Sequence, residues 1–387
     1  DRGGPEGPFD DGSDSTIEAV NKIADRGLRI AQPQLTISNQ QSAISNQQSA
    51  ISDPQSAMSS LLILRLSALG DVIHTLPAVA ELRRALPERK LVWAVEAPYR
   101  ELVETVAPVD QVVGLSTKKW RKSPFAAPTH SSVRALAGEL RSAVGRGDAI
   151  DFQGLVKSAM VGWWSGARLR FGFDASAIRE KAALLFLNRR MAVPEGLHVV
   201  DINRALARGV VAALGGAEVG EVEPDLSAWP ADPSGELAPL MRDRPVVLVP
   251  GAGRPGKQWN IDRFRSLAAF IEDGLRLPVV IAWGPGERHL ADGIAEGGKG
   301  MTAPPTTLRE LAFVLSRARL VVAGDTGPLH LAAALGADVV GLFGPTDPRR
   351  NGPYGQIPRC VESYSGSRTM EEIGVERVIE RVQEVLG

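Results

Sequence analysis

The sequence has a single cysteine, Cys360, among its 387 residues, and aromatic residues make up only 5% of it. One cysteine excludes a disulfide framework and a metal site built from several thiolates, and it is typical of a reducing compartment. The 44 basic and 45 acidic residues leave a formal net charge of −1, which argues against a general nucleic-acid binder. No apolar run approaches the roughly 18–20 residues of a membrane-spanning helix, and the first residues lack the regions of a secretory signal. We therefore expect a cytoplasmic chain with two domains.

Residues 1–57 differ from the rest of the sequence. The unit Ile37–Ala43 recurs at Ile44–Ala50 and, slightly altered, at Ile51–Ala57. Each unit has only isoleucine and alanine as apolar residues, so the repeat does not carry a coiled-coil seam. A tract so rich in Gln, Ser and Asn buries too little apolar surface to offset chain entropy, which predicts a disordered, low-complexity segment. Met58 stands directly before the first predicted strand, and we expect it to be the native start.

Short apolar runs alternate with amphipathic segments from Leu61 onward, and this alternation predicts parallel strands joined by helical crossovers. Prolines and acidic residues around Gly215–Arg244 indicate a linker, after which the alternation restarts. We therefore expect an α/β fold: an N-terminal Rossmann-like domain over 58–225 and a second one over 245–387, facing each other across a cleft. The predicted strands are Leu61–Leu66, Leu91–Glu96, Val109–Leu115, Ala149–Phe152, Val246–Val249, Pro278–Trp283, Leu320–Ala323 and Val339–Phe343.

Ligands of such sheets bind outside the carboxyl ends of the strands, so the loops that follow the strands are the candidates for a site. After the first strand comes Ser67–Asp71, in which Gly70 allows a tight turn and Asp71 begins the next helix. This position favours a carboxylate that points into the cleft. Taken alone, however, an aspartate at this position is more often a helix-capping residue.

The loop Gly251–Lys257 matches the G-x-G-x-x-G pattern of dinucleotide-binding proteins, but its context does not fit. Pro255 and Gly256 oppose a helix that opens there, and the next strand ends at Trp283 without an acid for a ribose. What remains is a glycine loop that ends in Lys257 and suits a diphosphate. Glu287, after the following strand, could accept hydrogen bonds from ribose hydroxyls. The alternative for Lys257 is a solvated surface lysine, and the alternative for Glu287 is an acidic residue in the first turn of a helix.

The segment Gly324–His330 carries the most specific pattern. A strand leads into Asp325, and a helix begins near Pro328, so the free amides of Thr326 and Gly327 form an anion site. His330 would face the same anion from the first helical turn. The rigid turn Gly344–Pro348 follows the next strand. Together these two loops predict a nucleotide-diphosphate pocket.

A basic run follows the third predicted strand and contains Lys118, Lys119, Arg121 and Lys122. Such a run is usually a solvated loop. Its place after a strand also suggests a phosphate-bearing acceptor or an anionic membrane surface.

These loops, in this order, resemble glycosyltransferase family 9, the lipopolysaccharide heptosyltransferases, from about Leu61 to Gly355. Ser67–Pro77 is similar to the amino-terminal signature of that family. Asp325–His330, followed by Gly344–Pro348, is similar to its donor-site signature. Three further stretches look most like the heptosyltransferase I subgroup: Arg121–Phe125, Asp151–Ala159 and Arg179–Arg190.

The resemblance implies a GT-B fold and inverting transfer of heptose from ADP-L-glycero-D-manno-heptose to the 3-deoxy-octulosonic acid (Kdo) of Kdo-lipid A. It implies no cofactor, no obligatory metal, and peripheral attachment to the cytoplasmic surface of the inner membrane of a Gram-negative-type cell. It places Asp71 as the general base, Lys257 on the donor phosphates and Glu287 on the ribose. Around the diphosphate and heptose it places Asp325, Thr326, Gly327 and His330. The acceptor-side residues it suggests are Lys118, Lys119, Arg121, Lys122, Lys157, Arg179 and His198.

Other functions remain open at this point. The nearest is another family 9 glycosyltransferase with a different acceptor or donor, similar to heptosyltransferase II. A sugar-nucleotide epimerase of the same architecture would consume the donor without an acceptor. A non-catalytic nucleotide-sugar binding protein would bind the donor and form no product. A NAD-dependent oxidoreductase ranks last, because the Gly251 loop does not fit a dinucleotide.

Overall fold

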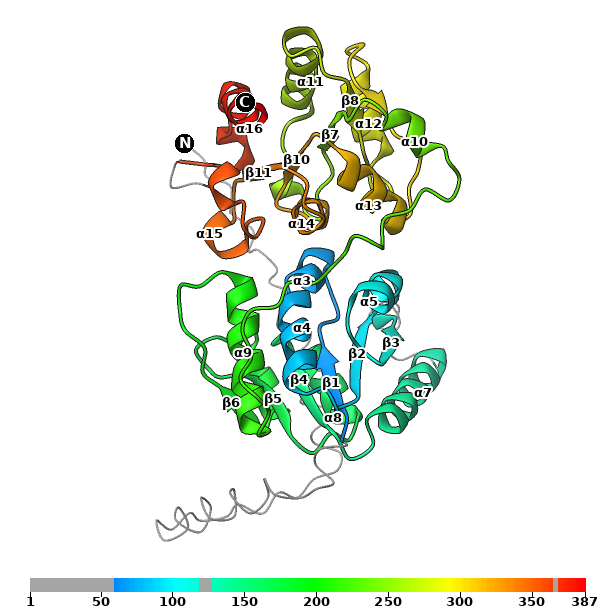
Figure 1. The fold of residues 1–387 in the computed structure, drawn as a ribbon, viewed down its shortest axis with the longest axis vertical. Coiled ribbons are helices and arrows are strands. Elements are labelled where there is room, and N and C mark those ends of the chain that lie inside the picture. Colours follow the sequence, from blue (N-terminus) through cyan, green and yellow to red (C-terminus); the bar gives the residue numbers. More distant parts are fainter. Residues whose placement is uncertain (1–58, 118–126, 365–367) are drawn as a thin grey trace, which may run out of the picture. The chain divides into compact units, whose positions relative to one another are not determined.

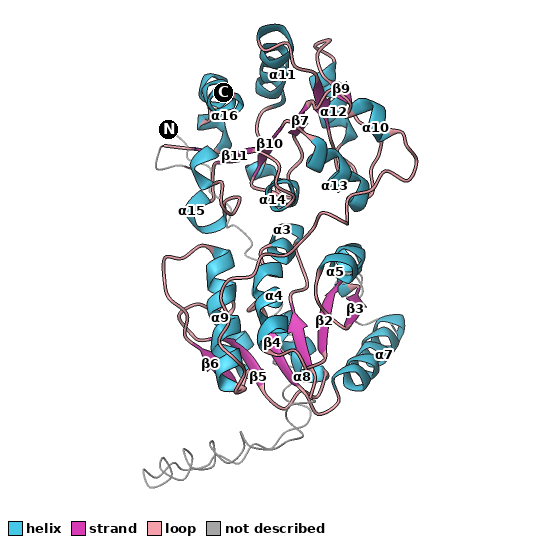
Figure 2. Cartoon of the chain, in the orientation of Figure 1, coloured by secondary structure: helices cyan, strands magenta, loops and turns pink. Residues whose placement is uncertain are grey.

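The computed structural model describes residues 59–117, 127–364 and 368–387, and Figure 1 shows the chain as a ribbon. The low-complexity tract 1–57, Met58 and the basic run lie outside these residues. The described part forms two six-stranded parallel sheets with helices on both faces, as Figure 2 shows by secondary structure. The α/β fold expected from the alternation of apolar runs and helices is confirmed.

The first sheet has the strand order β3-β2-β1-β4-β5-β6, so the order reverses between β1 and β4. Its strands are β1 (Leu61–Leu64), β2 (Leu91–Glu96), β3 (Gln111–Leu115), β4 (Asp148–Asp151), β5 (Arg170–Phe173) and β6 (Arg189–Met191). Its helices are α3 (Leu69–Ile73), α4 (Leu76–Ala85), α5 (Arg100–Val106), α7 (Ala127–Val144), α8 (Val156–Trp164) and α9 (Val199–Ala213), with 3₁₀ turns η4 (Ala97–Tyr99) and η5 (Lys181–Leu185).

The second sheet repeats this topology as β12-β11-β10-β7-β8-β9, with the reversal between β7 and β10. Its strands are β7 (Val246–Val249), β8 (Val279–Ile281), β9 (Met301–Thr302), β10 (Leu320–Gly324), β11 (Val339–Phe343) and β12 (Val361–Glu362). Its helices are α11 (Ile261–Ala269), α12 (Arg288–Ala295), α13 (Leu308–Arg317), α14 (Gly327–Ala334), α15 (Pro348–Asn351) and α16 (Val375–Leu386), and α10 (Leu237–Leu240) precedes β7. Short turns are η6 (Pro255–Lys257), η7 (Phe270–Gly274), η8 (Ile357–Arg359) and η9 (Met370–Glu372).

The strands are apolar without interruption because both faces of each sheet are covered. In β1, Leu61 and Ile63 pack in the core with α3, α4 and α9, whereas Leu62 and Leu64 pack on the other face with α7 and α8. The second sheet divides its side chains in the same way, with α13 and α14 on one face and α11, α12 and α16 on the other. The carboxyl ends of β1, β4, β7 and β10 therefore carry the loops at the two reversal points.

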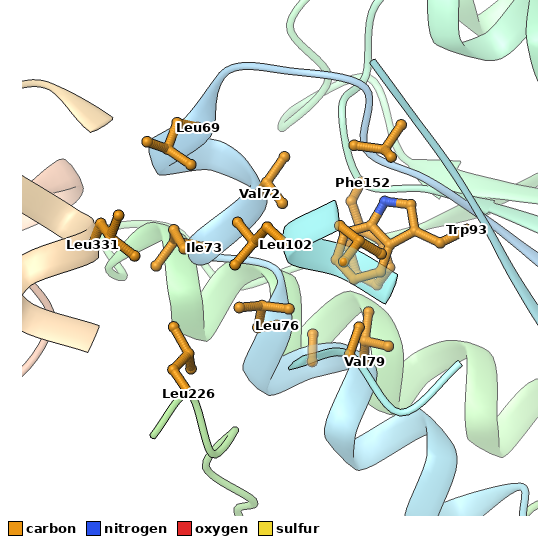
Figure 3. Packing of buried hydrophobic residues seen from close by; sticks show 14 of the residues in the cluster. Leu69, Val72, Ile73, Leu76, Val79, Trp93, Leu102, Phe152, Leu226 and Leu331 are labelled. Atoms are coloured by element: carbon orange, nitrogen blue, oxygen red, sulfur yellow. The ribbon is translucent and has the colours of Figure 1, made fainter. Parts of the chain in front are cut away.

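Helix α14 of the second sheet contacts α3 of the first, and one continuous apolar cluster includes side chains from both. Figure 3 shows Leu331 of α14 beside Ile73 and Leu69 of α3. The two signature segments singled out in the sequence thus begin helices that pack on each other.

Several predicted bounds are wrong. The helix expected to begin at Asp71 begins at Leu69 and is followed by a second one, so that α3 and α4 are separated at His74 and Thr75. The strands predicted over Leu61–Leu66 and Pro278–Trp283 are shorter and end at Leu64 and Ile281. The sequence analysis also missed four strands, β5, β6, β9 and β12. All are short, and charged residues open or close three of them, so they lack the apolar run that identifies a buried strand.

In the part of the chain that the structure describes, no helix is both long enough and apolar enough to cross a membrane.

Candidate active site

Asp71 lies in the first turn of α3, immediately after β1, and its carboxylate is held by the chain around it. Arg65, at the end of β1, donates from Nη2 to Oδ1 of Asp71 at 2.8 Å. The amide of Ala68 donates to Oδ2 at 3.2 Å, so Asp71 does cap its own helix. The side chain still keeps 29% of its surface exposed, whereas that of Arg65 keeps 3%. One oxygen is therefore fixed by a buried cation, and the carboxylate remains open to solvent.

The loop after β4 supports the loop of Asp71. Gln153 accepts a hydrogen bond from the Leu66 amide at 2.8 Å and donates one to the carbonyl of Ser67 at 3.1 Å. Asp151 in turn accepts hydrogen bonds from the amides of Gln153 and Gly154 and from the Ser158 hydroxyl. Burial raises the pKa of Asp151 to about 6, although these hydrogen bonds oppose the shift. Hydrogen bonds thus join the loops after β1 and β4 at the reversal point of the first sheet.

Two of the predicted acceptor-side cations lie at these loops. Arg179 Nη1 is 3.8 Å from Oδ2 of Asp71, and Nζ of Lys157 is 3.4 Å from the hydroxyl of Ser67. Both side chains are exposed, so positive charge borders the open side of the carboxylate. Lys118, Lys119, Arg121 and Lys122 lie outside the described residues.

His198, the seventh predicted acceptor residue, is the N-cap of α9 and is buried. Its Nδ1 accepts from the Val200 amide at 3.2 Å, and its Nε2 is 3.0 Å from the carbonyl oxygen of Gly352. Both ring nitrogens are therefore engaged with backbone groups. The arrangement caps a helix and joins it to the turn after α15.

At the second sheet, Asp325 gathers three side chains from the loops after β7, β10 and β11. Lys257 donates to its Oδ2 at 2.6 Å, Thr346 donates to the same oxygen at 2.8 Å, and His330 Nε2 lies 3.1 Å from Oδ1. Burial opposes ionisation of Asp325, but the hydrogen bonds from His330 and Lys257 outweigh it and hold its pKa at about 2. Asp325 is thus ionised at physiological pH, and its carboxylate holds Lys257 and His330 in place at the reversal point of the second sheet.

The remaining donor-side residues lie on loops at the same edge of the sheet. Oε2 of Glu287 accepts from the Gly284 amide at 3.1 Å. The carboxylate also lies against Gly251, where an added Cβ atom would clash with it. Thr326 is the N-cap of α14, and Gly327 is its first residue. The free amides of the first turn of α14 therefore lie next to Asp325, and a helix N-terminus of this kind is suited to bind an anion.

Helices α3 and α14, one from each sheet's half, touch through two glycines. A Cβ atom on Gly70 would lie 2.6 Å from the His330 ring, and a Cβ atom on Gly327 would lie 2.7 Å from Cβ of Leu69. Each signature segment thus supplies a glycine against a side chain of the other. This reciprocal contact, which we call the glycine contact, joins the candidate base region to the candidate donor region.

Beside the glycine contact, His74 is buried with its ring centroid 4.4 Å from that of His330 and 5.4 Å from that of His198. Burial and the two neighbouring imidazoles hold the pKa of His74 well below its usual range. The His74 ring is therefore neutral at physiological pH, and it packs between the two halves as an uncharged aromatic side chain.

The sequence analysis missed two residues of this arrangement. Arg65 directly follows the apolar strand β1, and a buried charged residue next to such a run is a signal that it meets a partner. Thr346 stands in the turn Gly344–Pro348, which the sequence did single out, but nothing in the sequence connects its hydroxyl with Asp325. Among the described residues, no group of three or more His, Cys, Asp or Glu side chains is placed to hold a metal ion.

Two Rossmann-ordered sheets whose carboxyl-end loops lie at their reversal points form the GT-B fold, which solved heptosyltransferase structures share. The family model of glycosyltransferase family 9 (heptosyltransferase) matches residues 135–374, and the chain belongs to that family. Lipopolysaccharide heptosyltransferase 1 of Escherichia coli is 33% identical over 302 residues, which are 76% of this chain and 91% of that protein. The protein of the same name from Pseudomonas aeruginosa is 34% identical over 302 residues, covering 76% of this chain and 81% of its own.

Solved structures agree with this assignment. The heptosyltransferase WaaC of E. coli with ADP superposes with a TM-score of 0.70 at 29% identity, covering 84% of this chain and 99% of its own. The E. coli ADP-heptose heptosyltransferase II has a TM-score of 0.65 at 21% identity, covers 84% of this chain and 98% of its own, and shows the shared fold. The fold, the enzyme class and the family expected from the signature segments are confirmed.

Proposed function

We propose that the protein transfers L-glycero-D-manno-heptose from ADP-heptose to the Kdo of Kdo-lipid A during assembly of the lipopolysaccharide inner core. The glycine contact supports this proposal most directly. It joins the helix that carries the partly exposed Asp71 carboxylate to helix α14, whose N-terminus lies beside Lys257 and Asp325. Relatives that are 33–34% identical over most of their length are named lipopolysaccharide heptosyltransferase 1.

ADP-heptose is the donor that the second sheet suits best. Solved structures of a relative contain ADP and ADP-2-deoxy-2-fluoro heptose. In this chain Lys257 and the amides of Thr326 and Gly327 would hold the diphosphate, and Glu287 the ribose. Because Asp325 already fixes Lys257 and His330, these two side chains are preorganised before the nucleotide binds.

The acceptor hydroxyl would lose its proton to Asp71, the base of the reaction. The hydroxyl oxygen then forms a bond to the anomeric carbon from the face opposite to the phosphate, while the bond from that carbon to the phosphate oxygen breaks. The configuration inverts, and the electron pair leaves with ADP. Lys257 and the α14 amides stabilise the charge that develops on the diphosphate. Arg179 borders the Asp71 carboxylate, Lys157 contacts Ser67 in the same loop, and these two cations suit an acidic acceptor sugar.

We further propose that no metal or other cofactor is required, because Lys257 and the helix N-terminus supply the positive charge that a metal would otherwise bring. Transfer should then keep its rate in excess EDTA. Because the acceptor is a membrane lipid, we also propose that the enzyme works while peripherally bound to the cytoplasmic surface of the inner membrane.

The test of the proposed function is whether ADP release depends on the right acceptor. The protein is incubated with ADP-heptose alone, with Kdo-lipid A, and with lipid A that lacks Kdo, and ADP and lipid mass are followed. The proposal predicts ADP release only with Kdo-lipid A, together with one added heptose on the lipid. Donor binding without transfer to Kdo-lipid A would contradict the acceptor and favour another family 9 reaction. ADP release without any acceptor would indicate a different chemistry.

A further inference from the structure

Large apolar side chains are exposed at one place of the first-sheet half. Trp163, at the end of α8, keeps 53% of its surface exposed, and Leu185, at the end of η5, keeps 80%. Phe186 is half-buried, and its ring centroid lies 6.3 Å from that of Trp163. Leaving such side chains in water is unfavourable, so side chains of this size gathered at one surface indicate that something covers them.

Basic residues are concentrated in the segment of the sequence that carries these side chains, and Arg190 reaches the carbonyl of Leu184 beside Leu185. Residues 157–190 contain seven basic side chains and only two acidic ones, although the whole chain is almost balanced. Lys181, Arg189 and Arg190 are exposed. Arg189 and Arg190 donate to the backbone carbonyls of Asn188 and Leu184, and within the described residues neither forms an ion pair. Their charge is thus available to a partner.

We call Trp163, Leu185 and Phe186, with Lys181, Arg189 and Arg190, the basic-aromatic patch. Its arginines lie on β6, and its other two elements, α8 and η5, begin near the candidate acceptor site. Lys157 is in the first turn of α8, and Trp163 lies seven residues after the first residue of this helix, about 10 Å along its axis. Arg179, which lies 3.8 Å from Asp71, comes directly before the segment that leads into η5. The patch is therefore continuous with the side from which an acceptor would approach Asp71.

We propose that the basic-aromatic patch is the surface with which the protein docks on an anionic lipid bilayer. Tryptophan and phenylalanine favour the boundary between headgroups and acyl chains, where a ring is half in water and half in lipid. Arginine and lysine are attracted to anionic headgroups, and their long stems lie along apolar surface. The proposal rests on the proposed function, because only a lipid acceptor gives the enzyme a reason to dock beside Asp71.

The test measures binding of the full chain to vesicles of phosphatidylglycerol and phosphatidylcholine by flotation. Trp163→Ser/Leu185→Ser should lower the vesicle-bound fraction at least tenfold. Arg189→Gln/Arg190→Gln should weaken binding about fivefold for each arginine and abolish the preference for phosphatidylglycerol. Met301→Ser, which removes a 52% exposed methionine at the second sheet, and Arg288→Gln/Arg319→Gln are the matched controls and should bind like the wild type.

Kinetics separate docking from folding and from the proposed function. All variants should bind ADP with wild-type affinity and convert detergent-dispersed Kdo-lipid A at the wild-type rate, whereas the patch variants should be slow on the same acceptor in vesicles. Unchanged vesicle binding in both patch variants would overturn the proposal. A wild-type dimer that dissociates in Trp163→Ser/Leu185→Ser, with vesicle binding unchanged, would make the patch a protein interface instead. If no acceptor were converted at all, the proposed function would fail while the flotation result still decided the docking surface.

Discussion

Replacing Gly70 with alanine perturbs the glycine contact in a way that the structure makes quantitative. The new Cβ atom would lie 2.6 Å from Cδ2 of His330, about 1 Å closer than an ordinary contact. Overpacking of this size costs about 1–3 kcal/mol. Alanine also favours the helical conformation of α3 by about 0.8–1 kcal/mol over glycine, which offsets part of that cost. We therefore expect a small loss of stability and a displacement of α3 and Asp71 relative to His330.

A displacement of about 1 Å between groups that must meet in the transition state lowers the rate about 100-fold. Gly70→Ala should thus reduce kcat for heptose transfer by this factor, lower Tm by only a few degrees, and leave ADP affinity within about threefold of wild type. Gly138→Ala in α7 is the control, because its Cβ would have no neighbour within 4 Å. A Gly70→Ala enzyme with wild-type kcat would refute the reasoning that the two signature segments must touch for catalysis.

Three further predictions concern stability and pH. Asp325 has its pKa held at about 2 against an ordinary 3.8, so the stability it contributes is present above pH 4 and is lost as pH falls toward 2. In Asp325→Asn, urea unfolding at pH 5 and pH 3 should show about 1 kcal/mol less of this acid-dependent loss, because the other half of the contribution disappears only below pH 3. Asp151 has its pKa raised to about 6, so it destabilises the fold progressively as pH rises from about 4 to above 6. Asp151→Asn should therefore be less sensitive to pH in that window, and a Tm series from pH 4 to 8 checks it. Glu81 is buried and accepts two hydrogen bonds of 2.9 Å from Arg208. Glu81→Gln should lower the free energy of unfolding by about 3 kcal/mol, and a loss below 0.5 kcal/mol would contradict the importance of this pair.

The sequence predicted the parts of the fold that depend on local pattern. Uninterrupted apolar runs such as Val246–Val249 identified strands that are buried on both faces, and the glycine-rich loops after them identified the candidate site. Short strands such as β9, with two residues, carry too little pattern to be recognised.

What the sequence could not predict depends on contacts between distant residues. Lys257 and Asp325 stand 68 positions apart, and their pairing follows from the adjacency of β7 and β10 rather than from either motif. The glycine contact has the same origin, since the tight turn expected at Gly70 gives no hint of His330. His198 was assigned to the acceptor from a resemblance alone, and its capping hydrogen bond to Val200 becomes visible only once α9 is built.

The central claim is that one half of the protein supplies the base and the other holds the donor. The most direct test measures kcat for transfer to Kdo-lipid A and the ADP dissociation constant in Asp71→Asn and Lys257→Ala side by side. The account predicts opposite patterns: Asp71→Asn binds ADP like the wild type and scarcely turns over, whereas Lys257→Ala binds ADP much more weakly. An Asp71→Asn enzyme that transfers heptose at nearly the wild-type rate, or a Lys257→Ala enzyme with unchanged ADP affinity, would contradict it.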